Sequence, residues 1–109
     1  MGTKTLLNDT PTNLLKKYRE VIVKAGIPVE QMILFGSHAE GNATAWSDVD
    51  VCVVSPLFGK KPFMEMLRLA KLARTVDTMI EPHPYNSKDL ADKYDPLAHE
   101  IRTHGVPLT

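Results

Sequence analysis

Apolar residues recur at regular intervals along most of the chain, and the interval differs from one stretch to the next. Over residues 11–25 they return every three or four positions, which predicts an amphipathic helix that Gly26 ends. The stretches 29–35 and 49–54 are short and almost wholly apolar, which predicts two buried strands. Residues 37–40 offer one helical turn between those strands, followed by a polar loop.

The second half of the chain predicts two further kinds of element. A proline opens the stretch 62–73, where apolar residues again share one helical face. Residues 78–83 predict a third strand, and prolines in and just after it place that strand at a sheet edge or end it early. Two short helices are expected over 88–94 and 96–104. Residues 106–109 are expected to be a tail.

This order of elements predicts an α/β fold, with a small mixed β-sheet flanked by helices. The strand–helix–strand connection from 49–54 to 78–83 is expected to make those two strands parallel. We expect residues 1–9 to form a flexible tail and residues 10–109 to form a single domain.

Composition and charge exclude several classes of protein. The chain has 13 Lys plus Arg and 13 Asp plus Glu, whereas a nucleic-acid binder usually shows a basic excess. No apolar run is long enough to span a membrane, and the first residues lack the apolar region of a signal peptide. Cys52 is the only cysteine, which suits a reducing compartment. We therefore expect a cytoplasmic protein with no membrane and no nucleic-acid partner.

The candidate chemistry lies between the first two strands, as Gly36-Ser37, ten residues, and then Asp48-x-Asp50. Alternate residues of a strand share a face, so Asp48 and Asp50 are expected to point the same way. Two adjacent carboxylates repel each other, and Mg²⁺ with substrate phosphates offsets that repulsion. Gly36 lets the backbone approach a ligand, and Ser37 offers a hydroxyl and an amide donor.

This motif and its spacing resemble the signature of the DNA polymerase beta-like nucleotidyltransferases, and specifically of the minimal nucleotidyltransferases (MNT). The resemblance implies a polymerase-beta-like palm fold. It also implies that Gly36, Ser37, His38 and Ser47 bind the nucleotide. Most members would have arginine where this chain has His38 and Glu40, so two phosphate-facing cations of the family are missing here.

A third acidic ligand is expected for two-metal phosphoryl chemistry. Glu81 lies within an apolar strand, where an unpaired carboxylate is unusual. Its surroundings resemble the third-acid strand of the family. Asp77 is the alternative, although it could simply begin that strand. His83 shares the strand face of Glu81 and is expected to border the site.

The resemblance implies a nucleotidyltransferase that transfers AMP from ATP to a hydroxyl group. Asp48, Asp50 and Glu81 would be the catalytic residues and would hold two Mg²⁺ ions. Many members of this family are the antitoxin of a HEPN/MNT pair, so the expected acceptor is a tyrosine of a separate HEPN toxin. Homo- or hetero-oligomers are compatible with this interpretation. The alternative is an inactive binding module that keeps the fold and neutralises its partner by contact alone.

Overall fold

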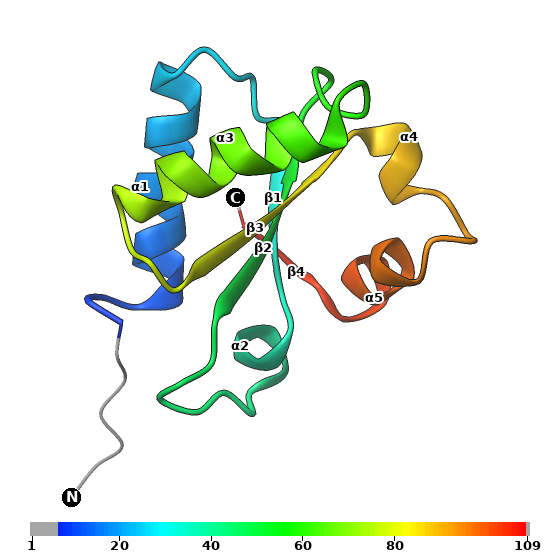
Figure 1. Cartoon of the computed structure of the whole chain (residues 1–109). Helices are drawn as coiled ribbons and strands as arrows, with labels where there is room; N and C mark the ends of the chain where they lie inside the picture. Colours follow the sequence, from blue (N-terminus) through cyan, green and yellow to red (C-terminus); the bar gives the residue numbers. More distant parts are fainter. Residues whose placement is uncertain (1–6, 109) are drawn as a thin grey trace, which may run out of the picture.

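A four-stranded mixed sheet forms the centre of the molecule, and helices cover both of its faces (Figure 1). The computed structural model describes residues 7–108. The sheet has the strand order β3-β2-β1-β4, and its strands are β1 Gln31–Phe35, β2 Val49–Val54, β3 Ile80–Tyr85 and β4 Val106–Leu108. This is the small mixed sheet that the sequence predicts.

The strand pairings follow from the connections. β1 and β2 are antiparallel, while β2 and β3 are parallel because the helix between them returns the chain to the same end of the sheet. Both the parallel pairing and the edge position of β3 are as predicted. Pro82 and Pro84 lack a backbone N–H, and an edge strand tolerates that loss because one of its sides needs no partner.

Proline and capping residues set the starts of the main helices. Proline occupies the first helical position of three of them, and the side chains of Thr10 and Asp95 cap two. The helices are α1 Pro11–Lys24, α2 Ser37–Glu40, α3 Pro62–Arg74, α4 Ser87–Leu90 and α5 Pro96–His104. α4 is shorter than the helix expected over 88–94, because Asn86 caps it and a turn follows at Ala91.

Side-chain alternation along β2 divides the core between the two sheet faces. Val49, Val51 and Val53 are fully buried and pack with α1 and α3. Cys52 and Val54 face the other way and pack with Ile101 of α5. Asp50 has the same parity as Cys52, so its carboxylate is on the α5 face, where the sheet is less fully covered.

The C-terminal segment differs from the expectation. Residues 106–109 were expected to be a tail, but Val106–Leu108 pairs antiparallel with β1, while Thr109 lies outside the described residues. Three residues with a central proline carry no readable periodicity. The free edge of β1 provides the partner, and Pro107 is tolerated because β4 is itself an edge strand.

The start of the described chain already contacts the domain. Of the tail expected over residues 1–9, residues 1–6 lie outside the described part. The backbone and side-chain N–H groups of Asn8 both donate to Asp77, and Asp9 pairs with Lys17 at 3.6 Å. Contacts of the domain therefore begin before residue 10. No helix within the described range is long and apolar enough to cross a membrane.

Candidate functional site

Gly36 brings the end of β1 against the start of β2. Its φ of 74° lies in the left-handed region that favours glycine. A Cβ atom built on Gly36 would collide with the carboxylate of Asp50. The absence of a side chain at Gly36 therefore leaves the space that the Asp50 carboxylate occupies.

Asp50 and Glu81 are direct neighbours on adjacent parallel strands. His83 follows on the same face of β3, with its Nε2 atom 3.8 Å from Asp50 Oδ1 and 3.9 Å from Glu81 Oε1. Ligand atoms of these three side chains all lie within 4.8 Å of one another. The ring of Phe35 packs edge-on against His83, with ring centroids 5.2 Å apart.

The electrostatics of this cluster disfavour an ionised Glu81. Partial burial raises the pKa of the Glu81 carboxyl, and the charge of Asp50 raises it further, while His83 acts in the opposite direction. Two adjacent carboxylates in a half-covered site are a poor arrangement for the protein alone. They become favourable when a cation lies between them, and their hard oxygen atoms are those that Mg²⁺ prefers.

Asp48 lies at the rim of this cluster. It is exposed and directly precedes β2, two residues before Asp50. The structure therefore brings Asp50, Glu81 and His83 together and leaves Asp48 outside that tight group. Asp48 is nevertheless close enough for its charge to raise the pKa of Glu81, so all three predicted acids act on one region.

Asp77, the alternative third acid, has other partners. It is buried, and its carboxylate accepts hydrogen bonds from Asn8 and, at 2.8 Å, from the backbone N–H of Met79. These contacts tie the start of β3 to the chain before α1. Asp77 thus satisfies backbone donors, while Glu81 faces Asp50.

The residues near the loop that are predicted to bind the nucleotide, Ser37, His38 and Ser47, have different surroundings. Ser37 is the first residue of α2 and is half-buried. The hydroxyl of Ser47 accepts the backbone N–H of Thr44 at 2.9 Å. The ring of His38 lies 3.2 Å from the carbonyl oxygen of Ser47, so His38 and Ser47 hold the loop that precedes Asp48.

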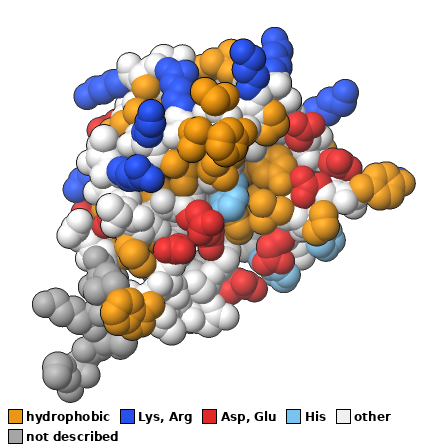
Figure 2. Space-filling view, in the orientation of Figure 1, with side chains coloured by type: hydrophobic (Ala, Val, Ile, Leu, Met, Phe, Trp, Pro, Cys, Tyr) orange, Lys and Arg blue, Asp and Glu red, His pale blue; other side chains and the backbone are white. Residues whose placement is uncertain are grey.

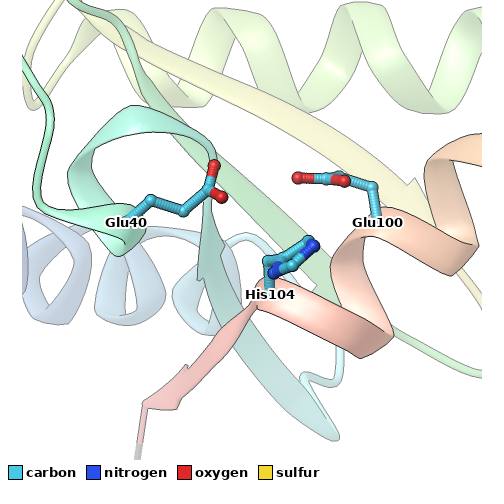
Figure 3. A group of neighbouring side chains, drawn as sticks. All are labelled: Glu40, Glu100 and His104. Atoms are coloured by element: carbon cyan, nitrogen blue, oxygen red, sulfur yellow. The ribbon is translucent and has the colours of Figure 1, made fainter.

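Glu40, at the second position where arginine is usual, does not join the Asp50 cluster. Figure 3 shows its carboxylate directed toward Glu100 and His104 of α5. Ligand atoms of these three side chains lie within 4.8 Å of one another. No sequence pattern predicts this group, because Glu40 and Glu100 are brought together only by the packing of α2 near α5.

Known proteins resemble this chain in sequence pattern and in fold. A family model described as a nucleotidyltransferase domain matches residues 15–99. No functionally curated protein matches the chain.

Several solved structures share the fold. A Sulfolobus solfataricus protein described as a nucleotidyltransferase superposes with a TM-score of 0.62 at 16% identity, covering 88% of this chain and 77% of its own. A chain from a toxin–antitoxin structure with AMP-PNP gives 0.61 at 24% identity, covering 90% and 72%.

A third structure contains a tri-AMPylated Shewanella oneidensis HEPN toxin with its MNT antitoxin. The match to it gives a TM-score of 0.59 at 20% identity, covering 92% of this chain and 72% of the other. These likenesses confirm the fold that the Gly36-Ser37 and Asp48-x-Asp50 motif predicts. The family match over most of its length shows that the chain belongs to the nucleotidyltransferase domain family.

Proposed function

We propose that this protein is a metal-dependent transferase that moves the AMP group of ATP to a hydroxyl of a partner protein. One observation carries the proposal. Asp50 and Glu81 face each other across two parallel strands, beside a glycine at which a Cβ atom would collide with the Asp50 carboxylate. Asp48 adds a third carboxylate two residues before Asp50.

The donor set fits Mg²⁺. Asp48, Asp50 and Glu81 offer only carboxylate oxygens, and Mg²⁺ is usually bound through a few carboxylates together with substrate phosphates. We assign these three residues as its ligands and propose that they hold two ions. When bound, Mg²⁺ supplies positive charge that offsets the carboxylates and the phosphates of the nucleotide.

The residues of the chain have distinct roles in this proposal. Gly36 and Ser37 bind phosphate oxygens of ATP, with His38 and Ser47 holding the loop beside them. Glu81 accepts the proton of the attacking hydroxyl beside the metal that it would help to hold. The hydroxyl oxygen forms a bond to the α-phosphorus while the bond to pyrophosphate breaks.

The structural neighbours suggest the acceptor. One contains an AMPylated HEPN toxin together with an MNT antitoxin, and another contains AMP-PNP. We therefore propose that the acceptor is a tyrosine of a HEPN-type toxin on a separate chain. In this role the protein acts as an antitoxin, because the AMP group blocks the toxin.

A second candidate function is neutralisation by contact without transfer. It is favoured by the residues at positions 38 and 40, where most members of the family would have arginine. His38 contacts the carbonyl of Ser47, and Glu40 is directed toward α5. Neither side chain presents a fixed cation to a phosphate.

The decisive experiment follows label from α-labelled ATP. The purified protein is incubated with Mg²⁺, labelled ATP and extract of its host, and label is followed on protein. The proposal expects transfer to one partner, its loss in Asp48→Ala/Asp50→Ala, and its retention in Asp92→Ala, an exposed carboxylate between α4 and α5. Absence of both label transfer and Mg–ATP binding would leave the contact-only function.

A further inference from the structure

The outer side of α3 carries a hollow with an apolar floor. Its volume is about 550 Å³, and it extends from the loop before α3 along the helix. Leu57, Met64 and Leu67 line it and are 52%, 60% and 41% exposed. Soluble proteins rarely leave three large apolar side chains exposed in one concave place unless something covers them.

The rim of this hollow is positively charged. Lys60, Lys61, Arg68 and Lys71, all of them exposed, line the hollow together with the apolar residues. The one acid in the lining, Glu65, is already engaged, because its carboxylate accepts the backbone N–H groups of Gly59 and Lys61.

The lining holds four cations against the single negative charge of Glu65, so it keeps a net positive charge. None of the ion pairs found among residues 7–108 includes any of them. Arg68 donates to the carbonyl of Ala25, which leaves its charge uncompensated. In a chain with no net charge, this concentration of cations creates a local positive field that attracts acidic partners.

We propose that this hollow docks an acidic amphipathic helix of the partner protein that carries the acceptor hydroxyl. The inference rests on the proposed function, because that partner is the substrate. The spacing supports a helical occupant, since Met64, Leu67 and Lys71 recur along one side of α3, where an elongated partner can follow them. An amphipathic helix fills such a groove with its apolar face and sets acidic side chains against the cationic rim.

The lining favours protein over nucleic acid. Single-stranded nucleic acids bind basic surfaces that also carry aromatic side chains for base stacking. The described residues that line the hollow are aliphatic or charged, and none is aromatic. An aliphatic floor is suited to leucine-like side chains of a helix.

The hollow and the carboxylate cluster are linked through the fold. α3 packs directly against β3, the strand that carries Glu81 and His83. Figure 2 shows Lys and Arg side chains along the upper edge of one face, an apolar region below them and acidic side chains below that region. The carboxylates lie on the opposite face of the sheet from α3, so a partner held on α3 would extend past the edge strand β3 to bring its hydroxyl to them.

The test uses two synthetic helical peptides with the same leucine face, one flanked by glutamates and one by lysines. Each carries fluorescein, and binding to the full chain is followed by fluorescence anisotropy. The acidic peptide is expected to bind about tenfold or more tightly than the basic one, and its affinity is expected to fall as salt rises. Equal affinity for both peptides, or no binding of the acidic one, overturns the proposal.

Variants locate the binding. Leu67→Glu is expected to weaken the acidic peptide about tenfold or more, because it places a like charge on the apolar floor. Val23→Glu is the matched control, since Val23 is 52% exposed on α1 and does not line the hollow. Equal weakening by both variants, or displacement of the peptide by a uridine oligonucleotide, contradicts a protein-docking groove.

A failure here can be told from a failure of the proposed function. Mg–ATP binding by Leu67→Glu is expected to match that of the wild type, because the substitution is outside the carboxylate cluster. If the acidic peptide binds in the hollow but the wild type neither binds Mg–ATP nor transfers label, the transferase proposal fails and the docking surface stands. If label transfer proceeds equally with Leu67→Glu, the docking proposal fails alone.

Discussion

Gly36 controls the site by having no side chain. Its positive φ and its closeness to the Asp50 carboxylate are two separate reasons for glycine. We expect Gly36→Ala to lower the free energy of unfolding by about 1–3 kcal/mol, from backbone strain and displacement of Asp50. The variant should also lose Mg–ATP binding. Urea denaturation and isothermal titration calorimetry measure the two effects.

Gly41→Ala separates the two causes. Gly41 has nearly the same φ, 78°, but a Cβ there would meet nothing within 4 Å. The control should therefore lose a similar part of its stability through strain and keep its Mg–ATP binding. Identical binding by both variants would show that contact with Asp50 is unimportant.

Glu81 gives the fold a pH dependence opposite to that of most carboxylates. Burial and Asp50 raise its pKa above the ordinary 4.5. The stability tied to its proton is thus fully present below pH 4.5 and is lost as the pH rises through the raised pKa. Without metal, Glu81→Gln should have a higher Tm than wild type at pH 7 and nearly the same Tm at pH 4.

Thermal melts in EDTA across pH 4–8 measure this difference. Glu20→Gln, on the exposed side of α1, gives the baseline for loss of a surface charge. A Glu81→Gln variant that is less stable than wild type at neutral pH would mean that the apo cluster is not under electrostatic strain.

Residues near one another in sequence were the predictable part of the site. Gly36, Asp48 and Asp50 form one motif, and Glu81 was singled out because it interrupts an apolar strand. The partner of Asp77 was not predictable, since Asn8 lies 69 positions away and asparagine has no pattern that would indicate the contact. The direction of Glu40 was missed for the same reason.

At the scale of elements, local signals decide what the sequence can show. Prolines, caps and helical periodicity gave the bounds of α5 as observed and those of α1 within one residue. β4 was missed because its three residues gain order only from the edge of β1. The pairing of two distant segments leaves no sequence pattern within either segment. The start of a helix, in contrast, is marked locally by proline and capping residues.

The N-cap of α5 is the element-scale feature that is simplest to test. The Asp95 carboxylate accepts the N–H groups of Leu97 and Ala98 and the hydroxyl of Tyr85. Burial opposes the charge, but these hydrogen bonds hold the pKa of Asp95 below its usual range. Asp95→Ala is expected to cost about 1–2 kcal/mol at pH 7.

The pH dependence of this cost has a defined sign. A depressed pKa contributes stability above the unfolded-state pKa, and that stability is lost as the pH falls through the folded-state value. The gap between wild type and Asp95→Ala should therefore narrow in acid. Asp95→Asn, which keeps an oxygen for the cap, should retain most of the stability in urea denaturation at pH 7. An alanine variant as stable as the asparagine variant would show that the cap contributes little.

At the scale of the whole molecule, a neutral chain separates its charges. Carboxylates gather near the first residues of β2 and β3, and cations that form no ion pair within residues 7–108 gather along α3. Each arrangement is unfavourable in isolation, because like charges in one place repel one another. The domain thus has two regions whose stability should increase on binding a ligand of opposite charge, one for a cation and one for an acidic partner.

The cation region yields the last prediction. An ion that binds only the folded state adds about 1.4 kcal/mol at ten times its Kd, which corresponds to a Tm increase of about 6 °C for a domain of this size. We expect Mg²⁺ to produce this increase in wild type and not in Asp48→Ala/Asp50→Ala. Glu100→Gln is the matched control, because Glu100 belongs to the separate group with Glu40 and His104. If the increase survives the double substitution but disappears with Glu100→Gln, the cation binds between α2 and α5 and the carboxylates of β2 and β3 are not its ligands.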